Sequence, residues 1–191
     1  MLRFDLRSGC CLRLFEESDA EELDRVIAAN RAYLAEWLDW ANAEGVEEWR
    51  AFIRRTREKV AANDGFCAAI IDDGAIVGWV GFDRIDWDSR STSIGYWLAR
   101  DRQGRGIMTE AVAALTSYAF EAWKLDRVEL RIEARNQRSA AIAERLGFRN
   151  EGIAQNAERH VPVKDIVVFS MLAQEWDGRE EPRLGQCSGM T

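Results

Sequence analysis

Gln103-Gly104-Arg105-Gly106-Ile107-Met108 is a glycine-bearing turn between a strand-like run, 92–98, and a run with helical spacing, 107–123. A strand-to-helix turn exposes unpaired backbone N–H groups and the positive end of the helix dipole. Because glycines let this backbone approach an anion closely, a phosphate or pyrophosphate can bind there without any lysine. Arginines also lie in or beside this turn, at positions 100, 102 and 105, and guanidinium groups match phosphate oxygens well.

The turn has two other interpretations. Taken alone, it is equally typical of a flexible loop with solvated arginines. A dinucleotide-binding G-x-G-x-x-G fingerprint fits less well, because Thr109 stands where the third glycine belongs. That motif also opens a doubly wound domain, and here too little chain follows the turn to build one. The surrounding sequence has to decide which ligand the turn binds.

Hydrophobic periodicity predicts the elements on both sides of the turn. Asp72-Asp73-Gly74, between two strand-like runs, is typical of a β-hairpin. Strands are expected at 2–6, 11–14, 66–71, 75–85, 92–98, 127–134, 148–155 and 163–173. Helices are expected at 19–38, 46–62, 107–123 and 136–146. This order predicts one α/β (α+β) domain over residues 1–176, with a mixed, mostly antiparallel sheet of about seven strands flanked by helices. Residues 177–191 are polar and are expected to form a flexible tail.

Composition excludes several classes of protein. The 191 residues carry a net charge of −7, which disfavours direct binding to nucleic acid or to an anionic membrane. The single histidine, His160, leaves no usual zinc site, so no metal is expected. No apolar run reaches the roughly 18 residues that span a bilayer. Four cysteines without a C-x-x-C pair, and no signal peptide, predict a reducing cytoplasm.

Two blocks of sequence resemble a known family. Ser93-Ile94-Gly95-Tyr96-Trp97-Leu98, followed by the turn, looks like the acetyl-CoA motif of the GNAT superfamily of N-acetyltransferases. In that motif, Q/R-x-x-G-x-G/A, Gln103 and Gly106 match, whereas Met108 replaces the final small residue. A second block of the family is matched by Asn136-Gln137-Arg138-Ser139 and by residues 144–148 of this sequence. Together the two blocks fix the spacing of the motif over roughly 55 residues.

The resemblance implies a GNAT-like acyl-CoA N-acyltransferase fold, an acetyl-CoA-dependent N-acetyltransferase activity and acetyl-CoA as cosubstrate. It implies that the pantetheine arm pairs with strand 92–98, where Trp97 and Leu98 present backbone groups, as in β-augmentation. The diphosphate is then expected at the turn, on Gln103, Gly104, Arg105, Gly106, Ile107, Met108 and Thr109. A homodimer is also compatible with the family.

Asn136 and Ser139 open the predicted helix 136–146. Asparagine is a favoured N-cap and serine is common in a first turn, so a purely structural role stays open. The resemblance implies instead that Asn136 bonds the cofactor arm and that Ser139 donates a hydrogen bond or proton to the leaving thiolate. Many family members place a tyrosine four residues after the Ser139 position for this purpose, but here that position is Ala143.

The proton acceptor is less defined by the sequence. A free α-amine has a reference pKa of roughly 7.7–8.0, against about 10.4 for lysine, so at neutral pH an α-amine needs no strong base. Asp83 and Asp86 follow the apolar run 77–82, near the place where a strand would meet the active cleft, and surface charge is the alternative explanation for each. Asp83 is the candidate if a carboxylate base exists.

Glu36-Trp37-Leu38-Asp39-Trp40 combines carboxylates with apolar side chains. The segment suits an amine pocket that excludes water, and it equally suits a helix end whose tryptophans belong to the core. Under the first interpretation Glu36, Trp37, Asp39 and Trp40 bind the acceptor.

Three functions follow from these observations. The first is acetyl transfer to the N-terminal α-amine of a protein, because Met108 and Leu38-Asp39-Trp40 look like the family branch that acetylates ribosomal-protein N-termini. The second is acetyl transfer to a small amine such as a polyamine, an amino acid or an aminoglycoside. The third is a CoA-binding sensor module without catalysis, for which Ala143 is the supporting feature.

Overall fold

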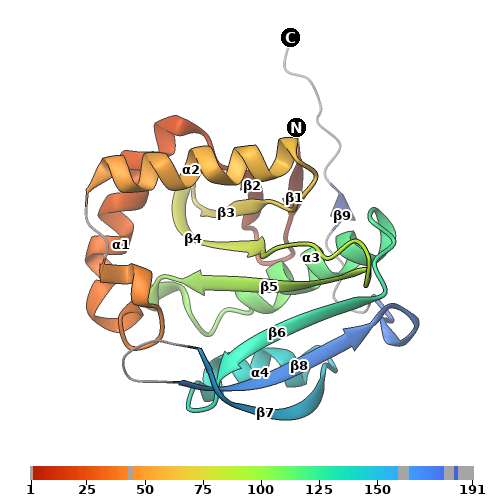
Figure 1. Ribbon diagram of the computed structural model, residues 1–191. Coiled ribbons are helices and arrows are strands. Elements are labelled where there is room, and N and C mark those ends of the chain that lie inside the picture. Colours follow the sequence, from red (N-terminus) through yellow and green to blue (C-terminus); the bar gives the residue numbers. More distant parts are fainter. Residues whose placement is uncertain (1, 43–44, 159–163, 179–182, 185–191) are drawn as a thin grey trace.

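The computed structural model describes residues 2–42, 45–158, 164–178 and 183–184, and within these ranges it forms one sheet with helices on both faces (Figure 1). The nine strands of these ranges lie in the order β7-β8-β6-β5-β4-β3-β2-β1-β9. Among them only β5 and β6 pair in parallel; every other neighbouring pair is antiparallel. The mixed, mostly antiparallel sheet predicted from the sequence is confirmed.

The strands follow the predicted runs closely. Their bounds are β1 Arg3–Asp5, β2 Cys11–Leu14, β3 Cys67–Asp72, β4 Ala75–Phe82, β5 Ser91–Leu98, β6 Arg127–Glu133, β7 Arg149–Glu158, β8 Lys164–Leu172 and β9 Arg183–Leu184. The last of these pairs with β1, so two residues of the predicted tail extend the sheet at its edge. Asp73 and Gly74 both adopt positive φ, which the tight turn between β3 and β4 requires.

The α-helices of the described residues are α1 Ala20–Leu34, α2 Val46–Ala61, α3 Ile107–Glu121 and α4 Gln137–Arg145. The prediction that the first helix continues to residue 38 was wrong, because α1 ends at Leu34 and a short 3-10 turn follows at Asp39–Asn42. At the start of α1, Ser18-Asp19-Ala20-Glu21 has the sequence pattern of a capping box. The box forms instead between Glu16 and Asp19 in a preceding 3-10 turn. No helix of the described part of the chain is long and apolar enough to cross a membrane.

The sheet separates two hydrophobic cores. One packs α3 and α4 against one face, and the other packs α1 and α2 against the opposite face of β3, β4 and β5. Among the described residues, the second core contains none from β6, β7 or β8. Figure 1 shows accordingly that α1 and α2 lie over the half of the molecule that contains β2, β3 and β4, away from β6, β7 and β8. This arrangement leaves the region between β5 and β6 accessible.

Candidate active site

The two central strands separate part-way along their length. β5 pairs with β6 only through residues 91–93, which face residues 127–129. Beyond that point β5 remains bonded to β4, and β6 remains bonded to β8. The sheet therefore opens into a gap between the carboxyl-terminal ends of β5 and β6. Ligands of sheets with parallel strands commonly bind outside such ends.

Backbone groups of β5 point into this gap. Ser93 and Ala99 make backbone hydrogen bonds toward β4, of 2.9 and 2.7 Å. Because backbone groups of an antiparallel ladder alternate in direction along the strand, those of Ile94, Tyr96 and Leu98 face away from β4. The Leu98 carbonyl is the acceptor nearest the glycine turn on this edge. By the same alternation, Trp97 directs its backbone toward β4, so of the two predicted arm-binding residues only Leu98 offers backbone groups to the gap.

Two cavities meet at the gap. The larger one, which we call the cofactor cleft, has a volume of about 1060 Å³ and lies among the end of α1, the glycine turn, the start of α3 and α4. The smaller one, which we call the acceptor cavity, has a volume of about 170 Å³ and lies between β5 and β6, beside Trp37. Both cavities are lined by Trp37, Leu38, Tyr96, Asn136 and Ser139.

The glycine turn forms one wall of the cofactor cleft. Gly104 and Gly106 have φ values of +79° and +80°, and Gly106 is the N-cap of α3. A Cβ atom added at either glycine would meet no other atom within 4 Å. The glycines are therefore required by backbone conformation rather than by crowding within the fold, and the open space beside them is free for a ligand. Of the predicted diphosphate-binding residues, those that line the cleft are Gln103, Gly104, Gly106, Ile107, Met108 and Thr109.

Arg105 does not line the cleft. Its guanidinium bonds Asp72 Oδ2 at 2.6 Å, and Asp72 is the buried last residue of β3. This ion pair holds the pKa of the Asp72 carboxyl below its usual value, because Arg105 donates hydrogen bonds to it. The side chain of Arg105 thus fixes the turn to the β3–β4 hairpin, which differs from the predicted role as a phosphate-binding fork.

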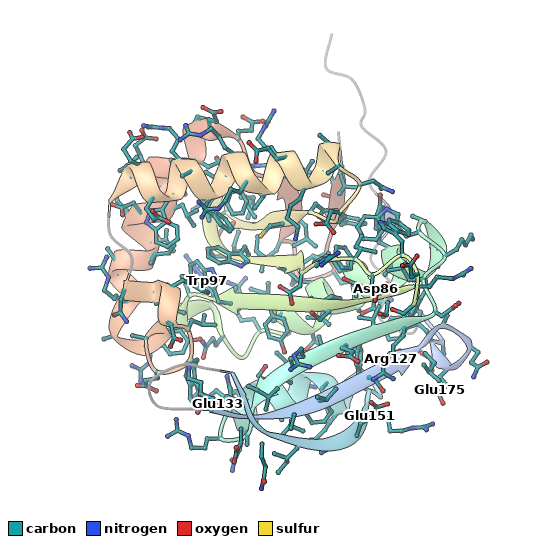
Figure 2. All side chains as sticks on the ribbon, in the orientation of Figure 1. Asp86, Trp97, Arg127, Glu133, Glu151 and Glu175 are labelled. Carbon is teal, nitrogen blue, oxygen red and sulfur yellow. The ribbon has the colours of Figure 1, made fainter. Side chains whose placement is uncertain are left out.

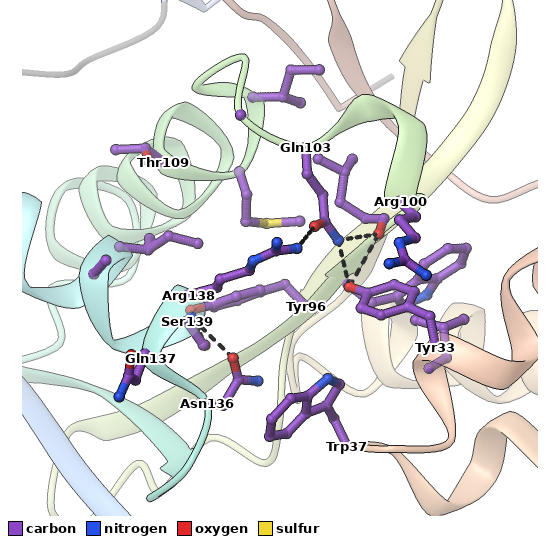
Figure 3. A pocket seen from close by; sticks show the side chains of 18 of the residues that line it. Tyr33, Trp37, Tyr96, Arg100, Gln103, Thr109, Asn136, Gln137, Arg138 and Ser139 are labelled. Carbon is purple, nitrogen blue, oxygen red and sulfur yellow. Dashed lines mark hydrogen bonds between the residues drawn. The ribbon is translucent and has the colours of Figure 1, made fainter.

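A chain of polar side chains crosses the cofactor cleft (Figure 3). Arg138 donates to Gln103 Oε1 at 2.7 Å, and Gln103 Nε2 donates to the Tyr33 hydroxyl at 2.6 Å. Gln103 and Tyr33 each lie 3.4 Å from the Leu98 carbonyl oxygen. The chain therefore links α1, the glycine turn and α4 at the backbone group to which a pantetheine amide would bond.

Asn136 and Ser139 lie where the two cavities join. Asn136 Oδ1 accepts the Ser139 backbone N–H at 3.1 Å, which caps α4 as the residue types predict. The Ser139 hydroxyl bonds the Tyr96 hydroxyl at 2.8 Å. Burial raises the pKa of Tyr96 to about 12, so its phenol is neutral at physiological pH.

Tyr96 is a functional candidate that sequence reasoning missed. It lies within the quoted family motif, but it was interpreted only as part of a strand. The position of the usual family tyrosine, Ala143, is completely buried in α4. Tyr96 brings a phenol hydroxyl to Ser139 from β5 instead. Strand alternation could have indicated this position, because successive side chains of a strand face opposite sides of the sheet. Trp97 packs in the core on the α1 and α2 side, so Tyr96 faces the α3 and α4 side.

Asp83 lies outside both cavities. Its carboxylate accepts the Ser93 hydroxyl at 2.5 Å, and its backbone carbonyl accepts Lys59 at 3.0 Å. Ser93 belongs to the part of β5 that still pairs with β6. The geometry therefore does not support Asp83 as a base that reaches the gap.

The segment predicted to bind the acceptor divides into two parts. Trp37 lines both cavities and Glu36 lines the cofactor cleft. Asp39 lines neither cavity; its Oδ1 lies 3.4 Å from Lys164 Nζ. Trp40 also lines neither, because its ring packs 4.5 Å from Trp79 in the aromatic cluster between α2 and the sheet. For Trp40 the core interpretation is the one the structure supports.

A family model described as the acetyltransferase (GNAT) domain matches residues 10–149, which include β2 to α4 and the glycine turn. The chain belongs to the GNAT acetyltransferase family. It is an acetyl-CoA-dependent N-acetyltransferase, with acetyl-CoA as cosubstrate.

Three relatives of this GNAT acetyltransferase are informative. "Putative ribosomal N-acetyltransferase YdaF" of Bacillus subtilis (strain 168) is 35% identical over 176 residues, covering 88% of this chain and 94% of YdaF. The structure of RimL, the ribosomal L7/L12 α-N-protein acetyltransferase, in complex with coenzyme A superimposes with a TM-score of 0.81 at 26% identity, covering 85% of this chain and 93% of RimL. The microcin C7 self-immunity acetyltransferase MccE, in complex with acetyl-CoA and AMP, gives a TM-score of 0.80 at 27% identity, covering 85% and 92%.

The cofactor cleft fits the chemistry of coenzyme A. Free N–H groups at the start of α3 suit a diphosphate, and the exposed edge of β5 suits an arm that contains amides. Arg138 and Arg145 also line the cleft from α4 and supply positive charge there. Neither arginine was predicted to bind the cofactor. Only their seven-residue spacing on the predicted helix, which places them on one face, could have indicated them.

Proposed function

We propose that this GNAT enzyme acetylates the N-terminal α-amine of a protein, and that ribosomal proteins are the first acceptors to test. The observation that carries the proposal is the meeting of the two cavities at Ser139. The cofactor cleft is large and reaches the glycine turn, whereas the acceptor cavity holds on the order of six water molecules. An amine at the end of a chain can enter a cavity of this size while the rest of the acceptor stays outside.

The reaction is a direct transfer in a complex with both substrates. Acetyl-CoA supplies the acetyl group as a thioester. The neutral amine nitrogen attacks the carbonyl carbon, the carbon–sulfur bond breaks, and the nitrogen releases its extra proton. The positions of Asn136, Trp37 and Leu98 around the junction allow them to orient the reacting groups, and orientation of this kind is a large part of such catalysis.

Ser139 assists the departure of the thiolate. Its hydroxyl lies at the junction, and the Tyr96 phenol can donate to the Ser139 oxygen, since the Tyr96 pKa of about 12 keeps its proton in place. The serine proton is then directed toward the sulfur. In this arrangement Tyr96 and Ser139 form a hydrogen-bond chain that ends at the thiolate, where many family members use one tyrosine. The proton released by the nitrogen passes to water, and the thiolate takes up a proton from water, so that Ser139 and Tyr96 both keep their own protons.

The alternative acceptor is a small amine. MccE is named for self-immunity to microcin C7 and its structure contains acetyl-CoA and AMP, so its name does not refer to a ribosomal substrate. The small volume of the acceptor cavity is compatible with either class. YdaF and RimL, whose names refer to ribosomal substrates, favour the protein N-terminus.

A panel of acceptors tests the proposal. Free thiol release from acetyl-CoA is measured with peptides that carry a free N-terminus, with the same peptides carrying a blocked N-terminus and a free lysine, and with polyamines, amino acids and aminoglycosides. We expect turnover with the free N-terminal peptides only. Turnover restricted to a small amine would replace the proposed acceptor, and coenzyme A binding without any turnover would indicate a sensor module.

A further inference from the structure

The acceptor cavity contains a buried carboxylate that no part of the mechanism above uses. Glu133 is the last residue of β6, and it lines the cavity together with Ser139, Tyr96 and Lys164. Its side chain is 8% exposed. Figure 2 shows Glu133 at the end of β6 that lies near the α1 side, far from Arg127 at the opposite end of the strand.

One oxygen of Glu133 is fully used and the other is not. Oε1 accepts Arg135 Nη2 at 2.5 Å. Oε2 is buried and has no hydrogen-bond partner among the described residues. The nearest cation, Lys164 Nζ, lies 3.6 Å from Oε2, which is too far for a hydrogen bond. A buried acceptor without a donor costs free energy, so a donor that enters the cavity and bonds Oε2 relieves that cost.

Lys164 makes no hydrogen bond to this oxygen, and two of its three N–H donors are directed elsewhere. Its ammonium donates to the Trp37 carbonyl at 2.9 Å and lies 3.4 Å from Asp39 Oδ1. Lys164 therefore joins the end of β6 to the segment that follows α1, and its charge balances the two carboxylates beside it. The hydrogen-bonding capacity that remains in the cavity is an acceptor, which suits a ligand that donates N–H groups.

We propose that Glu133 Oε2 binds the amine of the acceptor by accepting a hydrogen bond from its N–H group. This inference rests on the proposed function and adds the residue that recognises the reacting group. Glu133 and Ser139 line one cavity from two elements, β6 and the start of α4, so an amine held by Glu133 lies next to the junction where the thioester arrives. A primary amine on a slender chain is the chemical class that fits.

The test compares Glu133→Gln with Glu129→Gln. The first substitution retains the size of the side chain but removes its charge, whereas Glu129 lies on the same face of the same strand and lines neither cavity. We expect Glu133→Gln to raise the KM of the amine acceptor at least tenfold, with the Kd of acetyl-CoA unchanged, and Glu129→Gln to change neither. Glu133→Asp should recover part of the loss.

A second measurement separates recognition from structure. A peptide acceptor and its des-amino analogue, which lacks only the N-terminal amine, are compared as ligands of the acetyl-CoA-free enzyme by calorimetry. Wild type should prefer the peptide with the amine, and Glu133→Gln should lose that preference. The role of Glu133 is refuted if wild type turns over an acceptor and Glu133→Gln retains both the wild-type KM for that acceptor and the preference for the peptide that carries the amine. If wild type turns over no peptide but acetylates small amines, the proposed acceptor fails, and the same variant is tested with the small amine.

Discussion

Tyr96→Phe removes the hydroxyl at 2.8 Å from Ser139 and keeps the ring that packs against the core of α3 and α4. A neutral hydrogen bond of this kind contributes about 0.5–1.5 kcal/mol net. If the bond directs the serine proton only when the thiolate forms, its loss appears in kcat, and with 1.36 kcal/mol per factor of ten this corresponds to a decrease of about 2- to 12-fold. The KM of acetyl-CoA should stay within about twofold, since the backbone edge of β5 is unchanged.

The assay is thiol release at saturating acetyl-CoA and acceptor, repeated for Ser139→Ala and for the double variant. Ser139→Ala should lower kcat more than Tyr96→Phe does, because it deletes the group nearest the sulfur. The double variant should equal Ser139→Ala, since Tyr96 acts through Ser139 and the two effects are then not additive. Tyr118→Phe is the matched control, because Tyr118 is a partly buried tyrosine whose ring packs on Phe4 and Phe66 outside both cavities.

Two results would refute this reasoning. One is a Tyr96→Phe enzyme with the kcat of wild type, which would reduce the hydrogen bond to a packing detail. The other is a double variant whose loss equals the product of the two single losses, which would show that Tyr96 and Ser139 act independently.

Three other perturbations test the cleft and its surroundings. Asp72→Asn frees the arginine that fixes the glycine turn, so calorimetry should show several-fold weaker acetyl-CoA binding, whereas Asp73→Asn in the neighbouring turn should bind normally. The ion pair lowers the pKa of Asp72 in the folded protein, so the stability that it provides is present above about pH 4. This stability is lost as the pH falls through the lowered pKa of the folded state. Asp72→Asn should therefore lose less of its unfolding free energy in acid than wild type. Gly106→Val forces a β-branched residue to a φ of +80°, which costs about 1–3 kcal/mol of stability and should abolish measurable acetyl-CoA binding. Gly45→Val is the matched control, because Gly45 is also a helix N-cap, has a φ of +95° and lines neither cavity. It should lose stability alone, and equal binding by both variants would contradict the role of the turn. The pKa of Tyr96 is raised from 10 to about 12 in the folded protein. The stability linked to the neutral phenol, about 3 kcal/mol, is therefore fully present below pH 10 and is lost as the pH rises toward 12. Urea unfolding at pH 8 and 11 should show that Tyr96→Phe loses less unfolding free energy at the higher pH than wild type does.

Local sequence was sufficient to predict the four helices and all the described strands except β9, which lies in the predicted tail. The Asp72-Asp73-Gly74 turn and the glycines of the helix start at 107 have backbone requirements that only a few residue types meet, so their positions can be read directly. The end of α1 at Leu34 was not predictable in the same way. The residues that follow it keep a helical composition, and Lys164, which bonds the Trp37 carbonyl, is 127 positions away.

The direction of side chains limited the prediction of the site. Arg105 and Asp83 have the chemistry that phosphate binding and proton transfer need, yet tertiary partners turn them away from the cavities. Asp72 binds Arg105 from 33 positions away, and Ser93 donates to Asp83 across two strands. Composition identifies which residues are able to act, whereas pairing between distant elements decides which of them face the gap.

The separation of β5 from β6 links the fold to the chemistry. These strands form the only parallel pair of the described sheet, so α3 must cross from the end of β5 back to the start of β6. That crossover places the positive end of α3 beside the last residues of β5, where Leu98 and Tyr96 have no strand partner on the β6 side of the described sheet. On the far side of the same gap, the end of β6 carries Glu133 and leads into Asn136 and Ser139. One topological feature thus brings an anion site, an open strand edge, a hydroxyl pair and a buried carboxylate to a single opening, which is the set of groups that acyl transfer from a thioester to an amine requires.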